Sequence, residues 1–356
     1  MGGWRDNLID IEPYAPGEQI RVPGLIKLNT NENPFPPSPA AASAAGSFDA
    51  KSLMRYPDPD AGELVGILAA KAGVSEDMVV AGNGSDEILA FAFRAFFNSS
   101  RPVLFPDVTY SFYPVWCRLF GISYEEIPLR DDFHMYAADY ERENGGVVIA
   151  NPNAPTGIAE GLGFFRNLLD ANPDSIVIVD EAYVDFGADS ALTLIGEYDN
   201  LFVARTFSKS RSLAGLRLGF GYGHADLVVS VNAVKNSFNS YAVDSFAMAV
   251  GAEAARDDRY YRERTAELVR VRDSFTESMR GLGFIVYDSS ANFVFVSHPG
   301  VDAGDMYGWL KGRDILVRWF DKPRIRDHLR ITIGLAEEMD ALFTAISTYM
   351  KEKNIR

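Results

Sequence analysis

Short apolar runs recur through the middle of the chain and alternate with polar segments of helical length. The runs lie at residues 79–81, 103–105, 147–150, 176–179 and 201–204. An unbroken valine and isoleucine run predicts a strand covered on both faces, because a strand with one face in water alternates apolar and polar residues. Strands that alternate with helices usually run parallel. The pattern therefore predicts an α/β fold with a largely parallel main sheet.

A different pattern begins after about residue 241. Residues 257–279 form a charged stretch in which apolar side chains recur at helical spacing, and this predicts a long amphipathic helix. Short apolar runs follow at 292–296 and 329–333, and another amphipathic helix is expected near the C-terminus. These features predict a smaller α+β unit that the long helix joins to the main sheet.

The start of the chain is rich in proline, glycine and asparagine, which is typical of an extended segment. We therefore expect an N-terminal arm over 1–39 that joins the small domain, a large domain over 40–245 and a small C-terminal domain over 246–356. The length of 356 residues agrees with two domains, since it exceeds what one hydrophobic core usually supports.

Composition and charge narrow the classes of partner. The chain is 47% hydrophobic and carries a formal net charge of −15, which disfavours nucleic acid and anionic membranes. No run approaches the ~20 apolar residues of a membrane span. A single cysteine, Cys117, excludes an intramolecular disulfide, and the scattered histidines predict no metal site. We expect a soluble cytoplasmic protein.

Polar motifs follow four of the predicted strands, at the carboxyl ends where open α/β sheets bind ligands. The first, at 82–87, is a glycine turn that would cradle a phosphate with backbone N–H groups. Ser85 or Asp86 would cap the helix that follows. The resemblance to a dinucleotide fingerprint is weak, because Glu87 takes the third glycine position. A plain strand-to-helix turn is the alternative.

The second motif, 151–157, combines prolines, a glycine and asparagines. Proline and glycine fix the loop, and the asparagine amides offer donors and acceptors at the strand end. We interpret it as a ligand-binding loop, with a structural turn as the alternative.

The third motif begins with Asp180, which ends a strand predicted to be buried. A lone buried carboxylate is costly, so it needs a charged partner such as a protonated pyridine nitrogen. Tyr183, just beyond, would hydrogen-bond a phenolic oxygen. The alternative is that Asp180 caps a helix.

The fourth motif places Lys209 between two serines, with Arg217 eight residues later. A lysine that forms a Schiff base needs a fixed position at a strand end with anion-binding groups beside it. A solvated surface lysine is the alternative for this segment alone. Together, the four motifs match the phosphate, ring nitrogen, ring hydroxyl and aldehyde of pyridoxal 5'-phosphate.

The same motifs resemble, in their order, those of the fold-type I pyridoxal-phosphate aminotransferases, and within them those of the histidinol-phosphate aminotransferase group. The matching stretches cover nearly the whole chain: 27–34, 55–58, 82–89, 151–157, 180–183, 205–219 and 329–334. The resemblance implies a large domain with a mostly parallel sheet of seven-stranded type, a smaller α+β domain, and a homodimer with shared active sites.

The resemblance also implies a role for each matching residue. Lys209 would bind the cofactor and move the proton, Asp180 would keep the ring nitrogen protonated, and Tyr183 would bind the ring hydroxyl. The other implied cofactor contacts are Tyr110, stacked on the ring, Gly84, Ser85, Asp86, Asn153, Thr206, Ser208, Arg217 and, from the neighbouring subunit, Tyr56. The implied substrate contacts are Tyr14, Asn31, Arg318 and Arg330, of which Arg330 would pair with a carboxylate or phosphate.

One position departs from the family pattern. The family loop commonly has an asparagine directly before Pro-Thr-Gly, where its amide bonds the ring hydroxyl, whereas this chain has Ala154. Either Asn153 or Asn151 replaces that contact, or Tyr183 holds the hydroxyl alone.

By this resemblance we expect a transaminase that exchanges an amino group between L-histidinol phosphate, or a similar donor, and 2-oxoglutarate in histidine biosynthesis. Two related activities stay open, an aromatic amino acid aminotransferase and a threonine-phosphate decarboxylase, because both would keep the cofactor residues. The intact lysine, aspartate and tyrosine disfavour a non-catalytic binding module on the same fold.

Overall fold

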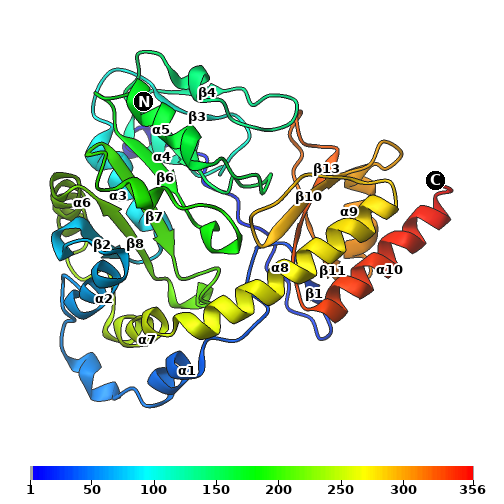
Figure 1. Ribbon diagram of the computed structural model, residues 1–356, viewed down its shortest axis with the longest axis horizontal. Helices are drawn as coiled ribbons and strands as arrows, with labels where there is room; N and C mark the ends of the chain where they lie inside the picture. Colours follow the sequence, from blue (N-terminus) through cyan, green and yellow to red (C-terminus); the bar gives the residue numbers. More distant parts are fainter. Residues whose placement is uncertain (1–2, 356) are drawn as a thin grey trace.

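The computed structural model describes residues 3–355; residues 1, 2 and 356, at the ends of the predicted arm and C-terminal domain, lie outside the described residues. Figure 1 shows a larger part built on a central sheet and a smaller part beside it, with the long helix α8 (Asp258–Gly281) running between them. The helix predicted over 257–279 is thereby confirmed.

The main sheet has seven strands in the order β2-β8-β7-β6-β5-β3-β4. Strands β3 to β7 pair in parallel, and β8 is antiparallel to both of its neighbours. The mostly parallel α/β fold is therefore confirmed. The strands are β2 (Val79–Gly82), β3 (Val103–Pro106), β4 (Tyr124–Ile127), β5 (Gly146–Ala150), β6 (Val177–Asp180), β7 (Leu201–Thr206) and β8 (Gly219–Gly223).

Two of these strands, β4 and β8, lack the apolar run that predicted the others. In β8 glycines alternate with aromatic residues, because a Cβ on Gly221 would lie 2.5 Å from the Phe202 ring of β7. Strand β4 lies at the edge of the sheet, where Glu125 and Glu126 are exposed. An edge strand is covered less completely, so its sequence need not be apolar.

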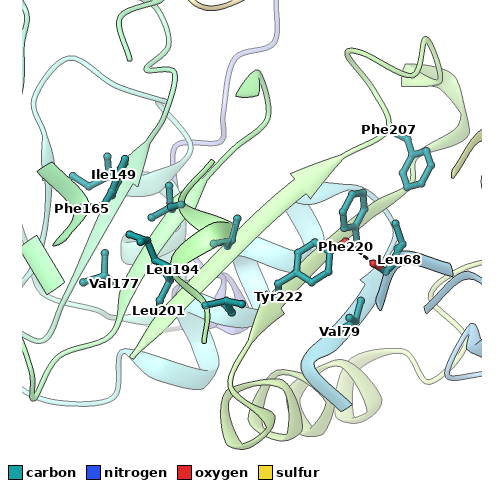
Figure 2. Close-up of a cluster of buried hydrophobic side chains, with 14 of the residues drawn as sticks. Leu68, Val79, Ile149, Phe165, Val177, Leu194, Leu201, Phe207, Phe220 and Tyr222 are labelled. Carbon is teal, nitrogen blue, oxygen red and sulfur yellow. Dashed lines mark hydrogen bonds between the residues drawn. The ribbon is translucent and has the colours of Figure 1, made fainter. Parts of the chain in front are cut away.

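Helices cover the main sheet and enclose its core. In Figure 2, Ile149, Phe165, Val177 and Leu201 pack together from strands and helix, all fully buried. Burying a side chain of this size contributes about 1.5–3 kcal/mol. The helices of this part are α1 (Pro39–Gly46), α2 (Gly62–Ala72), α3 (Ser85–Phe96), α4 (Tyr113–Phe120), α5 (Leu162–Ala171), α6 (Ala225–Phe238) and α7 (Ser245–Arg256).

The smaller part is an antiparallel sheet in the order β12-β13-β10-β9, packed on helices. Its strands β10 (Phe293–Ser297) and β13 (His328–Thr332) lie within one residue of the two predicted runs. The remaining elements are β9 (Ile285–Val286), β12 (Arg318–Trp319), α9 (Ala303–Lys311) and α10 (Ala336–Glu352).

The N-terminal arm is mainly extended and joins the smaller part. Its strand β1 (Ile26–Lys27) pairs in parallel with β11 (Ile315–Leu316), and Leu28 is buried in the core of the smaller part. The domain boundaries themselves stay a prediction. The short 3-10 helices are η1 (Trp4–Asn7), η2 (Ala50–Met54), η3 (Glu76–Met78), η4 (Ala137–Tyr140), η5 (Val184–Phe186), η6 (Ala191–Leu194) and η7 (Ala214–Leu216). Within residues 3–355, no helix has the length and apolar character needed to cross a membrane.

Candidate active site

A cavity of about 250 Å³ lies at the carboxyl ends of β5, β6 and β7, with the arm and strands β12 and β13 on its other sides. This is the edge at which parallel sheets bind ligands. Most of the predicted site residues line it: Tyr14, Asn31, Ser85, Asp86, Tyr110, Asp180, Tyr183, Thr206, Ser208, Lys209, Arg217, Arg318 and Arg330. Gly84, Asn153 and Tyr56 are not among the lining residues.

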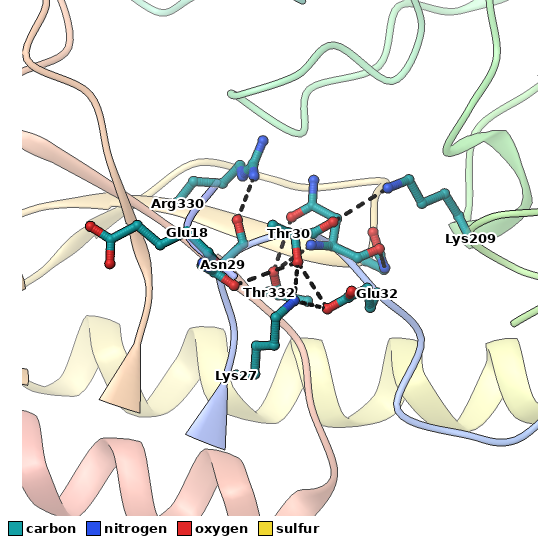
Figure 3. A network of polar contacts seen from close by, with 10 residues as sticks. Glu18, Lys27, Asn29, Thr30, Glu32, Lys209, Arg330 and Thr332 are labelled. Carbon is teal, nitrogen blue, oxygen red and sulfur yellow. Dashed lines mark hydrogen bonds and ion pairs between the residues drawn. The ribbon is translucent and has the colours of Figure 1, made fainter. Parts of the chain in front are cut away.

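Lys209 has a fixed backbone and a nearly free amine. Its carbonyl oxygen accepts a hydrogen bond of 2.9 Å from Asn33 Nδ2 of the arm, and the next residue, Ser210, hydrogen-bonds Asp185. Its Nζ lies 3.4 Å from the carbonyl oxygen of Thr30, the long contact drawn in Figure 3. Within residues 3–355 this is the one hydrogen bond of the amine, so the amine lies beyond the strand end and is available as a nucleophile.

Asp180 is a buried carboxylate that has hydrogen-bond donors but no ion pair among the described residues. The Tyr113 hydroxyl donates to it at 3.0 Å and the Ala182 backbone N–H at 3.2 Å. Burial raises the pKa of Asp180 to about 6, although both donors act to lower it. The helix-cap alternative is wrong, because the nearest short helix begins at Val184 and its N-cap is Tyr183.

The asparagine loop does not turn its amides toward the cavity. Asn153 Nδ2 donates to the Val108 carbonyl oxygen at 2.9 Å, and its Oδ1 accepts from the Thr109 hydroxyl at 2.8 Å. The amide of Asn151 is likewise bonded to the backbone of Glu160. Both amides therefore have partners within the protein, and a contact between Asn153 and the cofactor stays a prediction.

The glycine turn leaves the start of α3 uncapped. Gly84 is the N-cap residue, and no side chain caps this helix, so the expected cap by Ser85 or Asp86 is wrong. The first N–H groups of an uncapped helix bind anions. Gly84 has φ +91°, and a Cβ there would lie 2.7 Å from Arg217 Nη2, so glycine lets the arginine approach the turn.

Hydroxyl and charged groups surround that turn. The Thr206 hydroxyl lies 3.0 Å from that of Ser208. Arg217 forms an ion pair of 3.2 Å with Asp86, which also accepts a hydrogen bond of 2.8 Å from Tyr110. An arginine and hydroxyls beside a helix N-terminus are groups that bind a phosphate.

Two arginines form the opposite end of the cavity. Arg330 Nη2 donates to the Asn29 carbonyl oxygen at 2.9 Å, while its Nε is buried without a hydrogen-bond partner in the described part of the chain. Burial lowers the pKa of Arg330. Arg318 lies nearby and donates to the Ala15 carbonyl oxygen at 3.4 Å. Neither arginine forms an ion pair with a described residue, so this end suits an anion.

Several residues in or beside the cavity received no role from the sequence. Thr30 and Glu32 belong to a stretch that matched the family, and Lys27 pairs with Glu32 beside the Lys209 contact (Figure 3). Tyr113, the partner of Asp180, lies at the start of α4. The sequence carries no local signal for this contact, because the two residues are 67 positions apart.

Comparison with known proteins places the chain in a family. The family model described as "Aminotransferase class I and II" matches residues 23–346. The chain belongs to this family. A histidinol-phosphate aminotransferase of Acinetobacter baylyi is 46% identical over 353 residues, 98% of each chain. Histidinol-phosphate aminotransferase 2 of Dechloromonas aromatica is 49% identical, over 96% of this chain and 98% of its own.

Among solved structures, this aminotransferase chain is similar to the histidinol-phosphate aminotransferase of Sinorhizobium meliloti, whose crystal structure is a complex with pyridoxal-5'-phosphate. The TM-score is 0.82 at 24% identity, with 92% of this chain and 91% of the other covered. At that identity the likeness shows the fold.

Tyr56 lies away from the cavity of its own aminotransferase chain. Its side chain is 81% exposed and stacks on Tyr241, with ring centres 4.5 Å apart. A contact to the site of a neighbouring subunit stays a prediction.

Proposed function

We propose that this chain is a pyridoxal-phosphate-dependent aminotransferase that exchanges an amino group between L-histidinol phosphate and 2-oxoglutarate, in histidine biosynthesis. The observation that carries the proposal is the meeting of a lysine amine, a buried carboxylate and a phenol in one cavity: Lys209, Asp180 and Tyr183. The names of the relatives, at nearly half identity over nearly the whole length, support the choice of donor.

The residues present fit the cofactor. Asp180 is a buried carboxylate without a cation, which a protonated ring nitrogen would supply. Gly84 has no Cβ, so the Arg217 guanidinium can lie close to the turn. The residues that would hold the phosphate are Ser85, Thr206, Ser208 and Arg217, with Asp86 and Tyr110 beside them.

Each protein group then has a role in the reaction. When bound, pyridoxal phosphate supplies an electron sink for the carbon that carries the amino group. Lys209 holds the cofactor and moves a proton at that carbon through Nζ. Asp180 keeps the ring nitrogen protonated, because its negative charge stabilises the positive charge of the pyridinium. Tyr183 would bind the ring oxygen through its hydroxyl.

The anion end would select the substrate. Arg330 and Arg318 have no carboxylate partner among the described residues, and Arg330 has an unused buried N–H. A phosphate or carboxylate would satisfy both charge and hydrogen bonds. Tyr14, whose ring stacks on Phe112 with centres 4.4 Å apart, would close the cavity from the arm. The same end would take the acceptor, 2-oxoglutarate, since that molecule also ends in an anion.

We further propose a homodimer in which Tyr56 contributes to the partner's site. The exposure of Tyr56 away from its own cavity supports this arrangement. The cytoplasmic location stays a prediction.

A spectroscopic experiment tests the function. Purified protein with pyridoxal phosphate should gain a visible absorbance band that Lys209→Ala lacks. L-histidinol phosphate should then bleach the band, and 2-oxoglutarate should restore it. A protein without a lysine-linked band would contradict the proposal.

A donor screen separates the two related activities. Faster bleaching by tyrosine or phenylalanine than by L-histidinol phosphate would identify an aromatic amino acid aminotransferase. Release of carbon dioxide from threonine phosphate, with the band retained, would identify a decarboxylase.

A further inference from the structure

The amide of Asn31 is held in one orientation. Its backbone N–H donates to the hydroxyl oxygen of Thr332 on β13 at 3.0 Å, and that hydroxyl lies 3.0 Å from Asn31 Oδ1. Because Oδ1 can only accept, the threonine hydrogen is donated to it. At the other end of the amide, Nδ2 donates to the Tyr183 hydroxyl at 2.9 Å.

The backbone of Asn31 is also fixed. Its φ of +56° is in the left-handed region, which asparagine tolerates better than most residues. Asn292 Nδ2 donates to the Asn31 carbonyl oxygen at 3.0 Å, and Asn31 is 1% exposed. The amide therefore has little freedom to turn away from Tyr183.

This orientation decides how Tyr183 uses its hydroxyl. An amide Nδ2 has only hydrogens to offer, so the phenol oxygen accepts and its own hydrogen points elsewhere. The Tyr183 hydroxyl donates a hydrogen bond to no residue between 3 and 355, and its one hydrogen bond there is with Asn31. Lys209 Nζ lies 5.5 Å from the ring centre, and the ring packs against an apolar cluster that contains Ala154 and Phe293. The phenol hydrogen is left for a ligand in the cavity.

We infer that Asn31 is a positioning residue that donates to Tyr183 and thereby makes the Tyr183 hydroxyl a hydrogen-bond donor to the ring oxygen of the bound cofactor. The inference rests on the proposed function, since it takes pyridoxal phosphate as the ligand. It changes the role expected for Asn31, whose amide is occupied by Tyr183 and Thr332 instead of being free for the substrate. The direction of the Tyr183 hydroxyl is thus determined by Asn31 of the arm and Thr332 of β13, which are 301 residues apart.

A pH titration of the visible band tests this role. A donor to the ring oxygen stabilises its anionic form and so lowers the pH at which the lysine-linked chromophore loses its proton. In Asn31→Asp the carboxylate can only accept, so the Tyr183 hydrogen turns toward it. We expect the midpoint of the band to rise by about 1 pH unit, a change typical of one lost charge-stabilising hydrogen bond.

The matched control is Asn29→Asp. It places the same charge on the same arm, but the Asn29 side chain donates to the Glu18 carbonyl oxygen at 2.9 Å and not to Tyr183. It should shift the midpoint by less than half as much. Tyr183→Phe alone should raise the midpoint at least as far as Asn31→Asp does. In a protein that already carries Tyr183→Phe, adding Asn31→Asp should shift the midpoint no further than adding Asn29→Asp.

Equal shifts for Asn31→Asp and Asn29→Asp would overturn the inference, as would full additivity with Tyr183→Phe. If circular dichroism shows that the Asn31→Asp protein is unfolded, Asn31→Gly is used in its place, because glycine tolerates the left-handed φ. A smaller rise is then expected, and an unchanged midpoint overturns the inference. If the unsubstituted enzyme forms no band at all, the proposed function fails instead.

Discussion

The two ends of the cavity are built in different ways. At the cofactor end, Asp180 is the last residue of β6 and Lys209 follows β7. These strands are adjacent in one sheet and pair in register at Asp180 and Ala204. At the anion end, Arg330 comes from β13 and is held by the carbonyl of Asn29, 301 residues away. The main sheet therefore brings the lysine and the carboxylate together, with the arm holding Lys209 and Tyr183 in place, whereas the anion end is assembled only where distant segments dock.

The strongest test of this division is the loss of the lysine. Lys209→Ala should abolish the visible band and lower kcat by about 10³-fold or more, because it removes both the covalent link and the proton carrier. Single-turnover absorbance measures both effects. Thermal unfolding of the cofactor-free variant should match that of the unsubstituted protein, and a retained band would place the link elsewhere.

The second test uses the buried carboxylate at the cofactor end. In cofactor-free protein the pKa of Asp180 is raised to about 6, so between about pH 4 and pH 6 the folded state holds a proton that the unfolded state lacks. The bound proton stabilises the folded state fully below about pH 4. As the pH rises from 4 to 6, this stabilisation is lost and the free energy of unfolding falls by about 3 kcal/mol. Asp180→Asn should lack this fall.

Urea unfolding at a series of pH values measures the difference between the two proteins. Added pyridoxal phosphate should reduce it, since a cationic ring nitrogen lowers the pKa of the carboxyl. The same pH dependence in both cofactor-free proteins would contradict the account of Asp180.

The third test acts on the anion end alone. Arg330→Ala should raise KM for L-histidinol phosphate about 10–100-fold, the loss of one hydrogen-bonded charge pair, and leave the visible band unchanged. Arg326→Ala is the matched control, because Arg326 pairs with Asp321 at the surface at 2.8 Å. If Arg330→Ala also removed the band, the two ends would not be independent.

The smallest effect is expected at the glycine turn. Gly84→Ala combines a strained φ with a Cβ 2.7 Å from Arg217 and should weaken pyridoxal phosphate binding about 10-fold, since such strain costs about 1–2 kcal/mol. Gly73→Ala has the strain without the contact, because no atom lies within 4 Å of the added Cβ. It should lower thermal stability and leave cofactor affinity, measured by fluorescence titration, unchanged.

The same contrast explains what the sequence could predict. The sequence predicted strands β5, β6 and β7 and the polar motifs after them. A buried parallel strand has an unbroken apolar run, and the motif that follows marks its end. Strand β8 was not predicted, because Gly221 and Gly223 are there to allow close packing against Phe202, a tertiary contact that no local pattern shows.

What the sequence could not predict in the site has a similar cause. Asn153 lies at the expected strand end, but no local pattern shows that its amide is hydrogen-bonded to Val108 and Thr109. The pairing of Asn31 with Tyr183 joins residues 152 positions apart and leaves no local pattern. Residue types at strand ends are visible in a sequence, whereas the direction of each amide is set by contacts across the fold.

A crystal structure of the cofactor-loaded enzyme with L-histidinol phosphate tests the central claim most directly. The account predicts that the donor spans the cavity, with its amino group toward Lys209 and its phosphate against Arg330 and Arg318. A donor whose phosphate lies away from both arginines, or whose amino group points away from Lys209, would contradict it.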